Sequence, residues 1–281
     1  MQYRRVIRVL VGTVLVAAAP AVLGAQAPAA PVSPPTEPSL SRSQMGEFLA
    51  SARIVRDADI PMGVTHPVRL TLDDGHMRHD AAFSTIDEKQ QVWKGKDGRT
   101  ELDFVDSYRY TLAAYAVAEL VGLDGMMPVT IERRWEQHRG ALSWWIDTLM
   151  TEGARLKNGV RAPDAEGWND QVHRMRVFAQ LVGDTDRNVG NILIDHQWKL
   201  WMIDFTRAFR RTHQLLNVNE LQRCDRQLLE RLRALTKEQL TEKTKSYIGG
   251  AEIDALLARR ALIVARFEQL VTERGEARVL Y

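Results

Sequence analysis

Apolar residues alternate with polar ones in the first half of the chain, which predicts paired β-strands. Residues 68–72 alternate in this way, and residues 79–86 can return as a second strand after an Asp-Asp-Gly turn signal. Residues 129–134 and 141–146 predict a second pair of strands, joined by a polar turn that contains Gly140. The first half is therefore expected to contain two antiparallel hairpins.

The segment between these two hairpins has apolar residues at helical spacing. Asp106 or Ser107 can cap a helix that runs to about Val121, and Gly122 can end it. A serine cap also predicts a short helix that ends near Ala52, before the first strand. The order predicts a small antiparallel sheet with one principal helix.

The second half of the chain has the spacing of amphipathic helices. Asp164 can cap a helix that reaches Val182, and residues 192–203 predict a short hairpin. Further helices are expected at residues 219–235, 237–247 and 252–273. The fold class is therefore α+β, with a predicted sheet-rich lobe at residues 41–146 and a mainly helical lobe at residues 147–281.

The N-terminal segment predicts an export signal. Arg4, Arg5 and Arg8 precede an uncharged stretch, and Ala25-Gln26-Ala27 offers a cleavage pattern of small residues. We expect a signal peptide at residues 1–27 and an exported, periplasmic or extracellular protein. An uncleaved membrane anchor is the alternative, and a translation start at Met45 would give a cytoplasmic protein.

The amino-acid composition limits the classes of protein and partner that fit this chain. Prolines recur through residues 28–40, which predicts an extended linker. The 281 residues are 45% hydrophobic and 26% charged, as in an ordinary globular protein, and the formal charge is only +2. This balance gives no electrostatic basis for nucleic-acid binding. Cys224 is the only cysteine, so no internal disulfide can form, and its apolar neighbours favour a place in the core.

Three polar residues have the spacing that phosphoryl transfer requires. Asp186 is followed by Asn191 five residues later, and Asp204 ends an apolar stretch thirteen residues after that. In phosphoryl transfer, one carboxylate orients the attacking hydroxyl, while an amide oxygen and a second carboxylate hold the metal ions. The sequence therefore predicts Asp186 as the catalytic residue and Asn191 and Asp204 as metal ligands.

The chain resembles atypical protein-kinase-like proteins: the phosphatidylinositol 3-/4-kinases, HipA-type kinases and secretory-pathway kinases. Loops of the type Gly-Asn-Thr-Asp-Arg-His/Asn-x-x-Asn-x-Leu in that group match Gly-Asp-Thr-Asp-Arg-Asn-Val-Gly-Asn-Ile-Leu at residues 183–193. Their Ile-Asp-Asn/His-Gly-x-Ala-Phe motif matches Ile-Asp-Phe-Thr-Arg-Ala-Phe at residues 203–209. The resemblance covers roughly residues 60–210.

The resemblance implies a two-lobed kinase-like fold in an exported, bacterial-type protein that uses Mg²⁺ and ATP. Ile146 and Asp147 would lie near the hinge that receives the adenine. The implied partner is a protein or small molecule with a hydroxyl group, and the membrane is a partner only through an uncleaved N-terminal segment.

The sequence departs from the kinase pattern in its first half. A kinase carries a phosphate-binding Lys on its third strand and pairs it with a helix Glu. Ser84 and Thr111 stand at the corresponding positions. The residues that could reach inward instead are Lys89, Lys94 and Lys96.

Two functions therefore remain open. One is phosphate transfer from Mg-ATP to a hydroxyl group, and the other is a weak or inactive pseudokinase that serves as an exported scaffold. Within the loop, Arg187 is expected to be structural and to pair with a nearby acidic group, and Asp184 to hydrogen-bond locally. The basic stretch at Arg207, Arg210 and Arg211 predicts a solvated surface, with attraction of a phosphate-bearing substrate as the alternative.

Overall fold

The computed structural model describes residues 40–60, 67–95, 98 and 100–281. The predicted signal peptide at residues 1–27 and nearly all of the predicted linker lie outside these residues. Residues 40–281 form one compact unit. The predicted boundary between the lobes at residue 146 falls between two strands of this unit and stays a prediction. No helix in the described part is long and apolar enough to cross a membrane.

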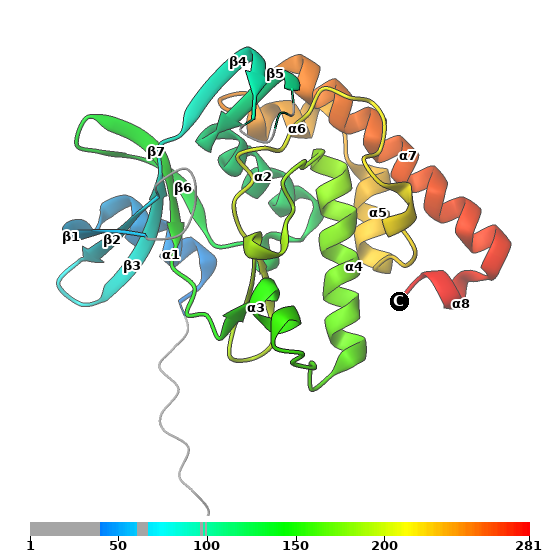
Figure 1. Ribbon diagram of the computed structural model, residues 1–281, viewed down its shortest axis with the longest axis horizontal. Helices are drawn as coiled ribbons and strands as arrows, with labels where there is room; N and C mark the ends of the chain where they lie inside the picture. The colour runs from blue at the N-terminus through cyan, green and yellow to red at the C-terminus, as the bar shows by residue number, and fades with distance from the viewer. Residues whose placement is uncertain (1–39, 61–66, 96–97, 99) are drawn as a thin grey trace, which may run out of the picture. The chain divides into compact units, whose positions relative to one another are not determined.

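A five-stranded antiparallel sheet forms the N-terminal part, with the strand order β1-β2-β3-β7-β6 (Figure 1). Its strands are β1 (Arg53–Asp59), β2 (Val68–Asp73), β3 (Arg78–Ser84), β6 (Thr130–Trp135) and β7 (His138–Trp144). Both predicted hairpins are present, as β2–β3 and β6–β7. The alternation that predicted them places Leu70, Leu72, Ala81 and Phe83 in one buried cluster.

Two helices accompany this sheet. α1 (Arg42–Ser51) is capped by Ser41 and adds Phe48 and Leu49 to the buried cluster on one face. α2 (Tyr108–Val121) begins at the cap Ser107 and ends at Gly122, as the sequence predicts. Tyr108 and Leu112 of α2 pack against Ala141 of β7. Since Ala141 lies opposite Ser84 in the ladder, α2 covers the face of the sheet that carries Ser84.

The order β-β-α-β-β is incomplete, because the structure adds strands that the sequence did not indicate. β1 pairs with β2 at the edge of the sheet. β4 (Asp87–Lys94) and β5 (Thr100–Ser107) form a separate two-stranded hairpin between β3 and α2. Most residues of β4 are exposed, so no apolar alternation marks this strand.

The C-terminal part is mainly helical, which confirms the predicted α+β class. Its long helices α4 (Ala165–Val182) and α7 (Gly250–Arg274) contact each other, and α4 is capped by Asp164 as predicted. The remaining helices are α3 (Glu152–Lys157), α5 (Arg226–Ala234), α6 (Lys237–Thr244) and α8 (Glu276–Val279). The helix expected at residues 219–235 is wrong in its first part, because Asp225 caps α5 only at Arg226.

A small three-stranded sheet lies in the C-terminal part, where β10 contacts α4. β8 (Met150–Thr151), β9 (Ile192–Ile194) and β10 (Leu200–Met202) form it, with β9 in the centre. β9 and β10 are the predicted short hairpin. Single-turn 3-10 helices lie nearby: η1 (Asp124–Met126), η2 (Val189–Asn191) and η3 (Val218–Glu220).

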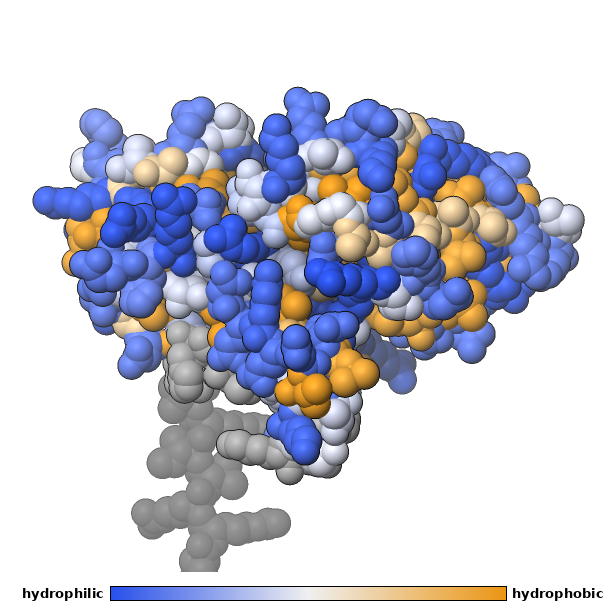
Figure 2. All heavy atoms as spheres, turned by 90° about the horizontal axis from the view of Figure 1, so that it is seen from above, coloured by the Kyte–Doolittle hydropathy of each residue, from blue (hydrophilic) through white to orange (hydrophobic). Residues whose placement is uncertain are grey.

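One large apolar core runs from α2 through α4 and the small sheet to α5 and α7. Cys224 is fully buried in this core, as expected, and burial raises the pKa of its thiol to about 12. On the face seen in Figure 2, polar and charged side chains cover most of the surface, with apolar side chains between them. A functional site is therefore expected where polar groups lie at the edge of this core.

Candidate functional site

The predicted loop begins where α4 ends. Gly183 ends the helix in the left-handed conformation, at φ +61°, which glycine adopts without strain. A Cβ at Gly183 would also come within 2.8 Å of the Arg259 guanidinium carbon. Arg259 of α7 is fully buried and donates hydrogen bonds to the carbonyl groups of Leu181 and Arg210. These contacts fix the direction in which the loop leaves the helix.

Arg187 holds the loop together. Its side chain is only 8% exposed and pairs with the buried carboxylate of Asp184, at 2.6 Å. Its guanidinium also donates to the carbonyl groups of Asn191 (2.8 Å), Ile203 (2.7 Å) and Asp204 (3.0 Å). The predicted structural role of Arg187 is therefore confirmed, and one side chain ties the two motifs to each other.

Asp184 completes this arrangement. Besides Arg187, its carboxylate accepts a hydrogen bond from the backbone N–H of Asp186, at 3.0 Å. Burial raises the pKa of Asp184, while the charge of Arg187 acts in the opposite direction. The local hydrogen bonding expected of Asp184 is confirmed, and it fixes the backbone at Asp186.

Asp186 and Asn191 lie side by side through a hydrogen bond of 3.0 Å from the Asn191 amide to the Asp186 carbonyl. The side chain of Asp186 is exposed and accepts a hydrogen bond from Asn188, at 3.1 Å. The side-chain oxygen of Asn191 accepts no hydrogen bond among the described residues. A carboxylate and an amide oxygen are thus both available to a ligand.

Asp204 adopts the left-handed conformation, at φ +56°, which is uncommon for a residue other than glycine. Its carbonyl is held by Arg187, and one carboxylate oxygen accepts a hydrogen bond of 2.9 Å from the Thr206 hydroxyl. The other carboxylate oxygen has no donor in the described part of the chain. Phe205 is fully buried against Phe178 and anchors the turn. The strained backbone presents this carboxylate next to the loop.

The structure adds Asp106, which the sequence offered only as a helix cap. Ser107 caps α2 instead, and the Ser107 N–H donates to the Thr206 carbonyl at 3.0 Å. One oxygen of Asp106 is buried without a hydrogen-bond partner in the described residues. Burial raises the pKa of Asp106, and the nearby charge of Asp204 raises it further. The pairing of β5 with the Asp204 turn brings these carboxylates together, and no local pattern could reveal it.

These donors fit magnesium better than a metal that prefers nitrogen or sulfur. Among the described residues, no group of three or more His, Cys, Asp or Glu side chains is arranged to hold a metal ion. Mg²⁺ takes oxygen ligands, and a protein commonly supplies one or two while water and phosphate oxygens complete the shell. The free oxygens of Asn191 and Asp204 and the unpartnered oxygen of Asp106 are of the type that Mg²⁺ prefers.

Ile146 and Asp147 lie on the connection between β7 and β8. The Asp147 side chain is 95% exposed, and the His196 imidazole lies 3.7 Å from its carboxylate. The same connection bonds to β9 through the Leu149 N–H and the Ile194 carbonyl, at 2.8 Å. The two residues thus occupy the expected link, but no hydrogen bond joins them to the loop. Their role toward a nucleotide stays a prediction.

The sheet face around Ser84 lacks the charged pair of a kinase. The Ser84 hydroxyl is buried without a partner in the described residues. Glu119 is the only acidic residue of α2, and it pairs with Lys243, at 3.5 Å. Lys89 and Lys94 are exposed on β4, so neither reaches inward. Lys96 lies outside the described residues.

Two of the three arginines after Asp204 are not solvated. Arg207 and Arg210 are each only 18% exposed and pair with Glu101 of β5, at 2.5 and 2.6 Å. The expected solvated surface is wrong for these two, because the β4–β5 hairpin, which the sequence did not indicate, contacts them. Arg211 is 64% exposed, as expected, and pairs with Glu252 of α7, at 2.9 Å. Arg207 and Arg210 hold the hairpin in place.

The chain shows little similarity in sequence to known proteins. No family model and no curated protein matches this sequence. Among solved structures, the chain is similar to the proinflammatory kinase CtkA of Helicobacter pylori, with a TM-score of 0.48 and 9% identity. The match covers 82% of this chain and 97% of that one.

Proposed function

We propose that this protein is a phosphotransferase of the protein-kinase-like type, which transfers phosphate from Mg-ATP to a hydroxyl group of a protein or small molecule. The observation that carries the proposal is the arrangement around Arg187. Four of its contacts fix the backbone of Asn191, Ile203 and Asp204 and the carboxylate of Asp184. The side-chain oxygens that phosphoryl transfer needs stay free.

Each residue then has a definite task. The exposed carboxylate of Asp186 orients the acceptor hydroxyl and can take its proton. Asn191 and Asp204 would hold magnesium, which neutralises charge on the phosphates when bound. The connection that contains Ile146 and Asp147 receives the adenine. Arg187 acts only through the backbone, because its guanidinium is already fully engaged.

The second candidate is a nucleotide-binding or scaffold protein without transfer activity. Ser84 and the missing acidic partner on α2 favour it, because the phosphates lose a cation that kinases provide. We therefore expect weak nucleotide affinity in either case. The two functions differ in whether phosphate reaches an acceptor.

A thermal-shift series on the full chain tests nucleotide binding. We expect Mg-ATP to raise the melting temperature, and Asp204→Asn to remove the part of the shift that depends on magnesium. Asp103→Asn is the matched control, since Asp103 also has a positive φ, +50°, and lies on the exposed hairpin. Absence of any shift in the wild-type protein would exclude the phosphotransferase.

Transfer of labelled phosphate separates the two candidates. We expect incorporation, into an added hydroxyl acceptor or into the protein itself, to be lost in Asp186→Asn while the Mg-ATP shift is retained. Binding without incorporation in the wild-type protein would support the scaffold.

We further propose that the protein acts outside the cytoplasm, after cleavage of the signal at residues 1–27. N-terminal sequencing of the natural protein tests this. A chain that starts near Pro28 supports export, an intact Met1 supports a membrane anchor, and Met45 supports a cytoplasmic form. A start at Met45 would also delete the cap Ser41 and the ion pair of Arg42 with Asp124.

A further inference from the structure

A cavity lies at the end of α2 opposite to Asp106. It has a volume of about 470 Å³ and opens between Gly122 at the end of α2, η1, α4 and α5. None of the residues of the candidate site lines it. Small-molecule sites commonly have this size, with an apolar wall and a few placed polar groups.

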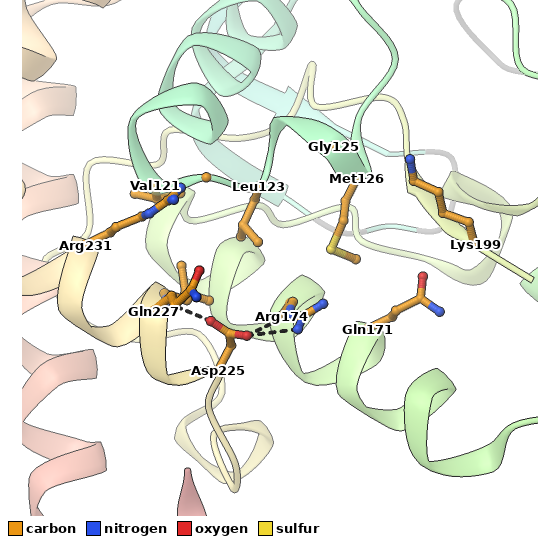
Figure 3. A pocket seen from close by; sticks show the side chains of 12 residues that line it. Val121, Leu123, Gly125, Met126, Gln171, Arg174, Lys199, Asp225, Gln227 and Arg231 are labelled. Atoms are coloured by element: carbon orange, nitrogen blue, oxygen red, sulfur yellow. Dashed lines mark hydrogen bonds and ion pairs between the residues drawn. The ribbon is translucent and has the colours of Figure 1, made fainter. Parts of the chain in front are cut away.

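Apolar side chains line the middle of the cavity. Leu123 is 4% exposed, Met126 7% and Leu228 2%. In Figure 3, Leu123 and Met126 lie between Arg231 at one end and Lys199 at the other. The cavity therefore offers an apolar body with a cation on each side.

One charged pair in the wall is already complete. Arg174 binds Asp225 at 2.8 and 3.2 Å, and Asp225 also accepts the Leu228 N–H at 2.8 Å as the cap of α5 (Figure 3). These contacts satisfy both side chains within the protein. Arg174 and Asp225 shape the wall and leave no net charge for a ligand.

The other two cations have no acidic partner. Neither Lys199 nor Arg231 forms an ion pair within the residues that the structure describes. Lys199 instead places its ammonium group 3.9 Å from the centre of the Trp201 ring. Burial lowers the pKa of Lys199, while the more distant charges of Asp195 and Asp124, which form no ion pair with it, act in the opposite direction.

Arg231 lies directly against the end of α2. A Cβ at Gly122 would come within 1.3 Å of its guanidinium, so glycine leaves the space that Arg231 fills. The negative end of the α2 dipole favours a cation there. The Arg231 guanidinium still has donors free to bind a carboxylate or phosphate group in the fork geometry typical of arginine.

We propose that this cavity binds a small organic dianion, whose two acidic groups are separated by a short apolar chain. One acidic group pairs with Arg231 and the other with Lys199, and the chain lies against Leu123 and Met126. The two unpaired cations at opposite ends and the apolar wall between them carry this inference, which does not depend on the proposed phosphotransfer.

Isothermal titration calorimetry on the full chain tests the proposal with succinate, glutarate, adipate and 3-phosphonopropionate. We expect at least one of them to bind with 1:1 stoichiometry. The dicarboxylates and the phosphonate together show whether the second acidic group is a carboxylate or resembles a phosphate. Butyrate and valerate have similar chains with one acidic group, and we expect them to bind at least tenfold more weakly.

Variants assign the site. We expect Arg231→Gln and Lys199→Gln each to weaken dianion binding at least tenfold. Arg226→Gln is the matched control on the same helix, because Arg226 pairs with Glu276 outside the cavity, and we expect no change. No binding of any dianion, or equal weakening in the control variant, would overturn the proposal. A melting temperature for each variant without ligand confirms that the fold is intact.

Discussion

The loop at residues 183–209 and the sheet face around Ser84 satisfy their polar groups in opposite ways. In the loop, one buried arginine pairs with Asp184 and holds three carbonyl groups, and the side chains at the loop edge are left free. At the sheet face, the buried Ser84 hydroxyl has no partner in the described residues, and α2 brings no carboxylate to it. The loop thus leaves side-chain oxygens free at its edge, while the sheet face around Ser84 lacks the Lys–Glu pair of a kinase.

This difference indicates which residues can be replaced without loss of an existing contact. Asp184 and Arg187 depend on each other, because loss of either side chain leaves its buried partner unpaired, whereas Asp204 meets Arg187 only through its backbone carbonyl. Ser84 and Thr111 have no such dependence, so charges can be added there without breaking an existing contact.

Removal of the Arg187 contacts in the loop should have the largest effect on the free energy of unfolding. Arg187→Met leaves the Asp184 carboxylate buried without its cation, and we expect a loss of about 3–5 kcal/mol in the free energy of unfolding, measured by urea denaturation. Arg233→Met removes an exposed ion pair with Glu268 and should cost less than about 1 kcal/mol. Similar losses in the two variants would show that Arg187 does not hold the loop.

Breaking the contact between the loop and the β4–β5 hairpin should have a smaller effect. Glu101→Gln leaves Arg207 and Arg210 largely buried with a neutral partner, and we expect a cost of roughly 1–3 kcal/mol. Limited proteolysis should then cut the hairpin faster than in the wild-type protein. Glu88→Gln on the exposed strand β4 is the control and should leave the rate unchanged.

Adding the Lys–Glu pair of a kinase to the sheet face tests the comparison at the region that lacks it. We expect Ser84→Lys together with Thr111→Glu to tighten Mg-ATP binding about tenfold, or about 1.4 kcal/mol, in calorimetric titration. Ser84→Met with Thr111→Gln adds similar volume without charge and should not tighten binding. If the charged pair also fails to do so, the sheet face does not contact the phosphates.

The smallest effect is expected at the exposed lysines of β4. Lys89→Ala with Lys94→Ala should change Mg-ATP affinity by less than about twofold, because neither side chain reaches the sheet face. A clear loss of affinity would show that the hairpin moves toward the nucleotide.

The sequence predicted those parts of the fold that short stretches decide. The caps at Ser41, Ser107 and Asp164 act within one helical turn, so residue type indicated where the helices begin to within two residues and left Ser43 and Asp106 as alternatives. The β2–β3 and β6–β7 hairpins showed alternation because one face is buried. β4 and β5 are largely exposed and therefore gave no such pattern.

In the candidate site as well, the sequence indicated some residues, and only the tertiary structure revealed the others. The spacing of Asp186, Asn191 and Asp204 is local, and the sequence identified all three as candidates and foresaw that Arg187 is structural. Asp106 could not be identified, since its place near Asp204 depends on a backbone hydrogen bond between residues 107 and 206. The pairing of Arg207 and Arg210 with Glu101 joins residues more than a hundred positions apart, at 2.5 and 2.6 Å.

The sequence by itself determined the class of the fold, the approximate helix starts and the three candidate polar residues, because residue types and their spacing along the chain show these features. Only the tertiary structure decided which charges are used internally and which remain free. It pairs Arg207, Arg210 and Arg174 with carboxylates and leaves Lys199 and Arg231 without any in the described residues. Whether a charge finds a partner depends on distances in space, and the order of residues along the chain does not contain those distances.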